Sequence, residues 1–203
     1  MNTRTVLILG AGGLGREVFW WAKEAGLDPV GFIDDNPAAL GDRTGYAPIV
    51  GGVEDAPLAC PVLCAIGQNA VRRVCVERLV ARGARFATLI HPQAKVLHAT
   101  LGTGAVLAPF AYVGADARAG DFLFMQTGAV LGHDVVAGDF LRMDTTAFVG
   151  GYAVLGDGVT LHTGAQVMPG KRVGDQCTLG AGAVLLANLH PSSTVFGVPA
   201  QKV

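Results

Sequence analysis

The chain has little charge. Asp, Glu, Lys and Arg make up 15% of its 203 residues and the formal net charge is −1, whereas soluble domains usually carry about 25% charged residues. Because basic residues are not in excess, no positive field can hold nucleic acid or an anionic membrane, and we expect neither as a partner. An intrinsically disordered chain is also excluded, since 51% of the residues are apolar.

Cysteines and long apolar runs are scarce as well. The four cysteines form no CxxC pair, and no pair of His or Cys has the spacing of zinc ligands, so we expect neither a disulfide scaffold nor a metal site. No apolar run approaches the roughly 20 residues that a membrane helix needs, and the first residues lack the apolar core of a signal peptide. The expected compartment is the cytoplasm.

Glycine, in contrast, is abundant, and the second half of the chain repeats every six residues. From Leu101 to Leu185 every sixth position is apolar, fifteen times in succession, and the next residue is Gly in nine of these cases. This period fits neither a helix nor an alternating strand. It is typical of a parallel β-helix, in which three hexapeptides close one triangular coil, residues 18 apart lie in register and Gly permits unusual backbone angles at the corner. Fifteen hexapeptides predict five coils, a stack roughly 24 Å tall.

The first half follows a different pattern. We expect a small α/β domain over residues 1–90 and a β-helix domain with a C-terminal tail over residues 91–203. Buried strands are predicted at 6–9, 30–33, 62–66 and 86–90, with helices ending near Ala25 and spanning 69–82. The second helix should present one apolar face, made of Val71, Val74, Cys75, Leu79 and Val80. This order predicts a β-α-β unit with a parallel sheet.

A glycine-rich turn lies between the first strand and the first helix. It reads Gly10-x-Gly12-x-x-Gly15, and Asp34 and Asp35 follow the next strand. This is the context of a dinucleotide-binding turn, in which free N–H groups at the helix start attract a diphosphate and an acidic residue holds ribose hydroxyls. The unit has about half the length of a full dinucleotide fold, which favours one nucleotide with a diphosphate, such as a nucleotide sugar. Nicotinamide-dependent reduction is the alternative.

His133 is the candidate general base. It lies two positions after Leu131, so it should point outward at a coil corner, with Gly151 one coil further in the same column. An imidazole there can take the proton from an attacking amine. Asp134 would orient the ring and stabilise its charge, provided that a turn brings the two adjacent side chains together. The Gly151 N–H is the candidate oxyanion donor, and His162 could also touch a ligand.

Together these features resemble the bacterial sugar acyltransferases. The chain is similar to the N-acetyltransferases of nucleotide-linked 4-amino-4,6-dideoxy sugars and to the sialic acid O-acetyltransferases. The segments that carry the resemblance are Gly10–Gly15, Phe32-Ile33-Asp34-Asp35, Ala65-Ile66-Gly67-Gln68-Asn69, Gly132-His133-Asp134 and the tail Val195–Ala200. The resemblance implies a left-handed β-helix, a homotrimer, acetyl-CoA lying between neighbouring β-helices and a nucleotide sugar held by the N-terminal domain.

The resemblance also implies roles for particular residues. Catalysis would use His133, Asp134 and Gly151. The nucleotide sugar would contact Gly12, Gly13, Leu14, Asp34, Asp35, Gly67, Asn69 and Gln126. Acetyl-CoA would contact Arg142, Gly151, Thr163 and Ala181. Relatives often carry histidine at positions 14 and 142 and asparagine at position 126, so the chain departs from the family there; the arginine could still meet a phosphate.

The sequence thus predicts a cytoplasmic, trimeric acetyl-CoA-dependent N-acetyltransferase that acts on the amino group of a nucleotide-linked sugar by direct attack. The family implies a product that feeds surface polysaccharide synthesis. One alternative is an O-acetyltransferase of sialic acid or a related sugar. Another is a noncatalytic, nucleotide-binding hexapeptide scaffold.

Overall fold

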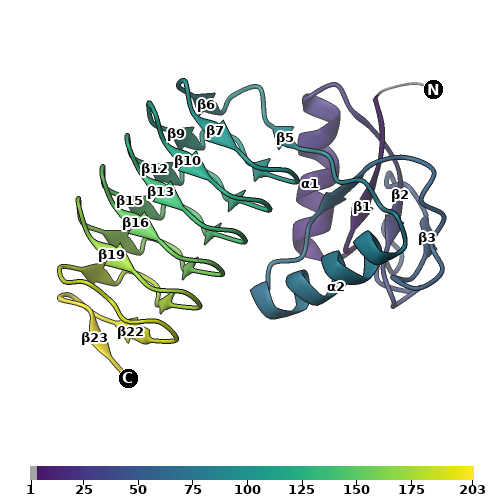
Figure 1. Ribbon diagram of the computed structural model, residues 1–203. Helices are drawn as coiled ribbons and strands as arrows, with labels where there is room; N and C mark the ends of the chain where they lie inside the picture. Colours follow the sequence, from purple (N-terminus) through teal and green to yellow (C-terminus); the bar gives the residue numbers. More distant parts are fainter. Residues whose placement is uncertain (1–3) are drawn as a thin grey trace. The chain divides into compact units, whose positions relative to one another are not determined.

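The computed structural model describes residues 4–203 and divides into two compact units, Met1–Pro92 and Gln93–Val203 (Figure 1). The first unit is an α/β fold. Its elements are β1 (Thr5–Leu9), α1 (Gly13–Glu24), β2 (Asp28–Ile33), β3 (Ile49–Gly51), β4 (Val62–Cys64), α2 (Asn69–Ala81) and β5 (Leu89–Ile90). Four strands form a parallel sheet in the order β3-β2-β1-β4. β1 is central and buried, which is why it is a continuous apolar run.

Two glycines shape the start of α1. Gly10 has φ +96°, a left-handed conformation that favours glycine. A Cβ on Gly15 would lie 1.9 Å from the Gly10 carbonyl oxygen, so the first turn of the helix can pack on the loop only without a side chain there.

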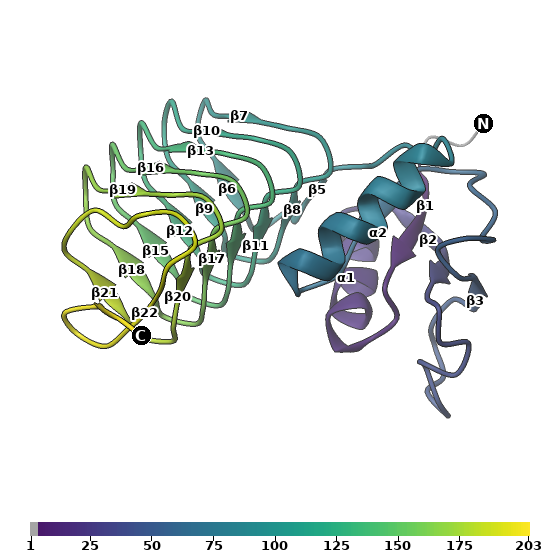
Figure 2. The same ribbon diagram turned by 60° about the horizontal axis from the view of Figure 1, so that its bottom comes forward.

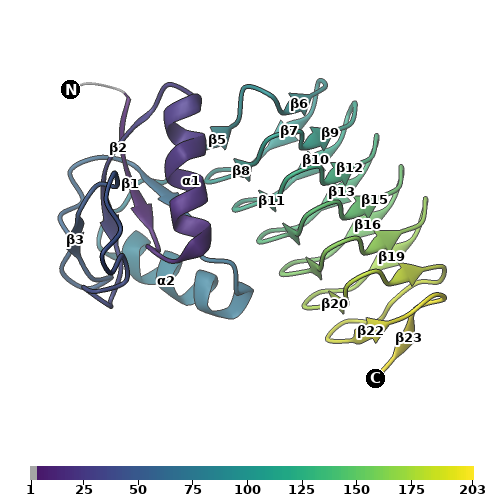
Figure 3. The ribbon, with the colours of Figure 1, turned by 180° about the vertical axis from the view of Figure 1, so that it is seen from behind.

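Gly26, with φ +76°, follows the end of the helix. Figure 3 shows α1 beside β1 and β2, the strands that it contacts.

Three details of the first unit differ from the prediction. The short strand β3 was not predicted, and the region 86–90 contributes only β5 and a single bridge from Phe86 to Val62. The predicted apolar face of α2 is wrong in part. The helix buries Arg72, Cys75, Val76 and Leu79, while Val71, Val74 and Val80 are exposed.

The second unit is a parallel β-helix, as the six-residue period predicted, and it is left-handed, as the family resemblance implied. Left-handed crossovers between parallel strands are rare. Figure 2 shows the three sides of the coils as separate sheets. The first side contains β7 (Thr100–Leu101), β10 (Arg118–Ala119), β13 (Val136–Ala137), β16 (Val154–Leu155) and β19 (Arg172–Val173). The second contains β8 (Val106–Leu107), β11 (Phe124–Met125), β14 (Arg142–Met143), β17 (Thr160–Leu161), β20 (Thr178–Leu179), β22 (Thr194–Phe196) and, antiparallel at the end, β23 (Gln201–Lys202). The third contains β6 (Lys95–Val96), β9 (Tyr112–Val113), β12 (Val130–Leu131), β15 (Phe148–Val149), β18 (Gln166–Val167) and β21 (Val184–Leu185).

Large aliphatic side chains fill the inside of the β-helix and small ones its corners. Leu131, Val149 and Val167 pair in register, 18 residues apart, and all three are buried. The apolar residue at every sixth position is therefore the core of this unit. No helix among residues 4–203 is long and apolar enough to span a membrane.

The glycines that follow the aliphatic residues have a different role from the predicted one. They do not have positive φ angles. Instead, the backbone of the next coil approaches them closely. A Cβ on Gly114 would lie 2.5 Å from the backbone nitrogen of His133, and a Cβ on Gly132 would lie 2.7 Å from the backbone nitrogen of Gly151. The left-handed conformation falls two positions later, on the second residue of the turn, as at Asp134.

A column of aspartates joins successive coils at the corner between the first and second sides. The Oδ1 atoms of Asp121, Asp139, Asp157 and Asp175 each accept a backbone N–H from the residue 18 positions earlier, at 2.7–2.9 Å. Gly102, Gly120, Gly138 and Gly156 lie under these carboxylates, and a Cβ on any of them would meet a carboxylate oxygen at 2.4 Å or less.

Candidate functional site

His133 and Asp134 form the turn between β12 and β13. Asp134 has φ +56°, and this left-handed turn brings the two adjacent side chains to the same side of the chain. The His133 Nδ1 lies 2.8 Å from the Asp134 Oδ2. A carboxylate only accepts, so Nδ1 carries the hydrogen and the neutral ring keeps its lone pair on Nε2. The His133 side chain is 57% exposed, which leaves Nε2 accessible to a reactant.

The His133 ring packs over Gly151. A Cβ on Gly151 would lie 2.6 Å from Nε2 and Cε1 of that ring. The ring of Tyr152 meets the imidazole edge to face, with centroids 5.0 Å apart and an angle of 86°, and the Tyr152 N–H donates to the His133 carbonyl at 3.0 Å. Sequence reasoning missed Tyr152, although its position next to Gly151 in the following coil was a usable signal.

The two backbone groups of Gly151 differ in their hydrogen bonding. Its carbonyl accepts the Gly170 N–H at 2.9 Å, whereas its own N–H donates no backbone hydrogen bond within residues 4–203. A donor beside the His133 ring can stabilise charge that develops on a carbonyl oxygen.

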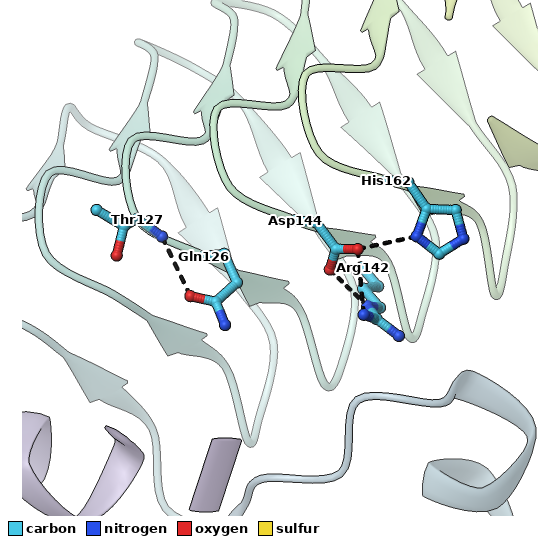
Figure 4. A network of polar contacts seen from close by, with 5 residues as sticks. All are labelled: Gln126, Thr127, Arg142, Asp144 and His162. Carbon is cyan, nitrogen blue, oxygen red and sulfur yellow. Dashed lines mark hydrogen bonds and ion pairs between the residues drawn. The ribbon is translucent and has the colours of Figure 1, made fainter. Parts of the chain in front are cut away.

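A second polar cluster joins Arg142, Asp144 and His162 (Figure 4). Arg142 Nε donates to Asp144 Oδ1 at 2.6 Å, and a terminal guanidinium nitrogen donates to Oδ2 at 3.1 Å. His162 Nδ1 lies 2.9 Å from the same Oδ2. Sequence reasoning considered Arg142 and His162 singly and missed Asp144. The 18-residue spacing of Asp144 and His162 was the signal that could have found it.

Two further residues predicted for acetyl-CoA lie in the same corner as this cluster, whereas Gly151 lies at the His133 corner. Thr163 and Ala181 open successive turns after β17 and β20, and the Thr163 carbonyl accepts the Gly182 N–H at 2.9 Å. Gln126 lies one coil before Asp144, and its Oε1 accepts the Thr127 N–H at 3.4 Å. This corner joins the second and third sides, whereas His133 lies where the third side meets the first. Of the site residues predicted in the second unit, Asp134 and Gly151 are the ones that the structure places beside His133.

In the first unit, Asp34 holds the glycine-rich turn. Its Oδ2 accepts the Ala11 N–H at 2.8 Å, and its Oδ1 accepts the Asn36 N–H at 2.9 Å. Asp35 Oδ1 accepts the Val53 N–H at 2.7 Å. Both carboxylates line a cavity of about 220 Å³, walled by Leu9, Gly10, Ile33, Val53, Ile66, Val71 and Cys75. They also line a wider groove of about 650 Å³ that extends along Gly51, Gly52, Glu54 and Asp55.

The two glycines predicted to meet a diphosphate lie at the start of α1. Gly12 is the N-cap residue and provides no side-chain cap, and both Gly12 and Gly13 are exposed. Helix N–H groups that lack a side-chain cap form a site suited to an anion. Leu14 is half-buried in the first turn, and Gly67 and Asn69 lie at the start of α2.

Burial raises the pKa values of two cysteine thiols, Cys64 and Cys75. Burial raises the pKa of the Cys64 thiol to about 11, with the positive charge of Arg72 opposing this. Burial also raises the pKa of Cys75, and the negative charge of Asp35 adds to it. Among residues 4–203 there is no group of three or more His, Cys, Asp or Glu that could hold a metal ion.

Comparison with known proteins connects both units with sugar acetyltransferases. Residues 5–79 match the family model of the PglD N-terminal domain. The chain is 30% identical to the acetyltransferase domain of PglB from Neisseria gonorrhoeae, solved with acetyl coenzyme A, with a TM-score of 0.91 and 100% of both chains covered. It is 28% identical to PerB from Caulobacter crescentus, solved with CoA and GDP-perosamine, with a TM-score of 0.86 and 98% of this chain and 97% of PerB covered.

A further match is a variant of GDP-perosamine N-acetyltransferase from Caulobacter crescentus with one histidine replaced by alanine, also solved with CoA and GDP-perosamine. It is 29% identical, with a TM-score of 0.86, and the match covers 98% of this chain and 96% of that one. A comparison with curated protein sequences gave no match.

Proposed function

Because the chain belongs to the family of hexapeptide sugar acyltransferases, we propose that it transfers an acetyl group from acetyl-CoA to the amino group of a nucleotide-linked amino sugar. The observation that carries the proposal is the His133–Asp134 pair, an accessible imidazole held in one tautomer by a carboxylate. The uncapped start of α1 and the cavity beside Asp34 and Asp35 support binding of the acceptor sugar through its nucleotide diphosphate.

The relatives support both substrates. The PglB domain was solved with acetyl coenzyme A, and PerB with CoA and GDP-perosamine. The residues of this chain fit the same substrates. Gly12 and Gly13 would contact the diphosphate, and the corner that contains Arg142, Thr163 and Ala181 would contact acetyl-CoA. Gly67, Asn69, Leu14 and Gln126 complete the proposed acceptor contacts.

The geometry around His133 supports the following reaction. The His133 Nε2 removes a proton from the sugar amine as the amine nitrogen attacks the thioester carbonyl carbon. Asp134 keeps the ring in the required tautomer and stabilises the imidazolium that forms. The Gly151 N–H stabilises the oxyanion. The C–S bond then breaks, the nitrogen keeps the acetyl group, and His133 returns its proton to the departing thiolate of CoA.

The positions of the proposed acetyl-CoA contacts support an assembly of several copies of the chain. His133 and Gly151 lie at one corner of the β-helix, whereas Arg142, Thr163 and Ala181 lie at another, and one side of a coil spans on the order of 15–20 Å for five to six extended residues. One thioester cannot contact both corners of one chain. It can do so where the His133 corner of one chain faces the Arg142 corner of a neighbour, which supports a closed ring such as the homotrimer.

The test is a thiol-release assay with acetyl-CoA and a panel of UDP-, GDP- and dTDP-linked amino sugars. The unmodified protein should release CoA with one class of acceptor. The variants H133A and H133N should lose about 10²- to 10⁴-fold in kcat, the usual contribution of a general base, and should still bind CoA. An acetyl product that survives mild base identifies an amide, whereas a labile product identifies an ester and an O-acetyltransferase.

His98 provides a matched control. It also hydrogen-bonds a carboxylate, that of Asp116, through Nδ1 at 2.8 Å, and it is more exposed than His133. The variant H98A should keep full activity. If H133A released CoA as fast as H98A, the assignment of the base would be wrong. We propose that the reaction takes place in the cytoplasm, where the four free thiols would stay reduced.

A further inference from the structure

The segment that follows β3 forms a wall of both hollows in the first unit. Val53 lines the cavity of about 220 Å³, and Gly52, Glu54 and Asp55 line the groove of about 650 Å³. Residues 52–56, named the 52–56 loop from here on, contain no helix or strand. The position of this wall therefore depends on the hydrogen bonds that the loop makes with its surroundings.

One side of the 52–56 loop is bound to the two aspartates of the proposed acceptor site. The Val53 N–H donates to Asp35 Oδ1 at 2.7 Å, and the Gly51 carbonyl, just before the loop, accepts the backbone N–H of Asp34 at 3.0 Å. A Cβ on Gly52 would lie 2.6 Å from Asp35 Oδ1, so the loop and this carboxylate are in close contact. Asp34 in turn holds the glycine-rich turn. A displacement of the loop would therefore reach both aspartates.

Arg82 holds the other side of the loop. It follows the last residue of α2 as the C-cap, and its two terminal guanidinium nitrogens donate to the carbonyls of Val53 at 2.6 Å and of Ala56 at 2.8 Å. The planar guanidinium presents its donors in a fixed fork, which suits two neighbouring carbonyls. Val53 and Ala56 are buried. Without the guanidinium their carbonyls would lose these donors, and the loop would have to move toward water to replace them.

The helix α2 has a second contact with the loop, the ion pair between Arg78 and Glu54. Their side chains are 46% and 63% exposed, and ion pairs between exposed side chains stabilise a fold only slightly. The hydrogen bonds from Arg82 to two buried residues are therefore the stronger connection between α2 and the loop.

We propose that Arg82 is a positioning residue for the nucleotide part of the acceptor. By holding the 52–56 loop, it keeps the wall at Val53 and the carboxylates of Asp34 and Asp35 in the arrangement that the nucleotide binds. The inference rests on the proposed function and adds a residue that lines neither hollow itself. Arg82 thus contributes to the affinity for the acceptor and not to the transfer of the acetyl group.

The test measures binding of UDP, GDP and dTDP by calorimetry, and thiol release with the nucleotide-linked amino sugar that the unmodified protein accepts. In R82A, Kd for the nucleotide and KM for the acceptor should each rise about tenfold, which corresponds to the loss of one buried hydrogen bond. The kcat at saturating acceptor and KM for acetyl-CoA should stay within about twofold. R82K keeps one donor group and should show a smaller rise, of about threefold. It gives the same comparison if R82A does not fold.

Two control variants separate this role from a general effect of removing an arginine. R43A is the matched control, because Arg43 also donates to a backbone carbonyl of the first unit, that of Leu40, at 3.1 Å. It should leave Kd and both KM values unchanged. R78A removes the exposed ion pair with Glu54 and should raise Kd by no more than about twofold.

Hydrogen exchange measures the loop directly. The peptide that contains residues 52–56 should lose protection in R82A and keep it in R43A, because only the first variant frees the loop. Thermal unfolding verifies that both variants are folded. Unchanged protection of this peptide in a folded R82A variant would overturn the inference.

The binding results distinguish the inference from the proposed function. An R82A variant that binds the nucleotide as tightly as the unmodified protein overturns the inference, and so does an equal loss of affinity for nucleotide and acetyl-CoA. A rise in Kd that is as large in R78A assigns the effect to the ion pair and also overturns it. If the unmodified protein binds none of the three nucleotides and releases no thiol with any acceptor, the proposed function fails and the inference fails with it.

Discussion

Replacing Gly151 by alanine tests whether the placement of the His133 ring matters for the reaction. The added Cβ would lie 2.6 Å from Nε2 and Cε1, whereas ordinary contact begins at 3.4 Å, so the ring must retreat by about 0.8 Å. Gly151 does not have a positive φ angle, so alanine introduces no backbone strain there. The imidazole is more than half exposed and can move outward, so the fold should tolerate the change.

The expected result is a loss of turnover without a loss of stability. A misplacement of about 1 Å can lower a rate by about 100-fold, so kcat should fall by about 30- to 100-fold, equivalent to about 2–2.7 kcal/mol. The midpoint of thermal unfolding should stay within about 2 °C of that of the unmodified protein, because only a half-exposed contact changes. Steady-state thiol release at saturating acetyl-CoA and acceptor measures the effect.

A double-mutant cycle with H133A supplies the control. Once the imidazole is absent, G151A should have almost no further effect on kcat, because the methyl group then has no ring to displace. A G151A variant that keeps kcat within twofold would refute the reasoning. An equal loss in both backgrounds would instead assign the effect to the Gly151 N–H.

Three further predictions test the scaffold. D139A should lower the free energy of unfolding by about 0.5–1.5 kcal/mol, because the Asp121 N–H loses its acceptor, while D139N should retain most of it; urea titration measures both. The raised pKa of Cys64 means that the folded state holds its proton more tightly than the unfolded chain, so its contribution to stability is complete below pH 9 and declines as pH rises toward 11. Urea titration at pH 7 and pH 10.5 should show a smaller pH dependence in C64A. D34A should weaken binding of the nucleotide sugar at least tenfold in calorimetry, because the Ala11 N–H is released, and D34N should weaken it less.

The sequence predicted the β-helix well because its core repeats without interruption from Leu101 to Leu185. It did not predict β3, because three residues after Pro48 carry no periodic signal. The face of α2 was misjudged because valines at positions 71, 74 and 80 looked like core residues, whereas the fold buries Arg72 instead.

The candidate site could be predicted where its residues are neighbours in sequence, and for Gly151, which follows His133 by one coil of 18 residues. His133 and Asp134 are adjacent, so a turn alone brings them together. The contact between Asp144 and His162 depends on the register of coils. Once the period is known that register is calculable, but which side chains use it depends on rotamers that composition does not determine.

The column of aspartates restricts how the protein can change in length. Each carboxylate accepts a hydrogen bond from the backbone N–H one coil of the β-helix earlier, at a separation of 18 residues. Removing or duplicating 18 residues keeps every remaining carboxylate opposite a backbone N–H. It also keeps a glycine beneath each of these carboxylates. Any other insertion inside a strand or tight turn slides bulky side chains over those glycines. Shortened or extended versions made by whole turns should therefore fold, whereas those made by single hexapeptides should not.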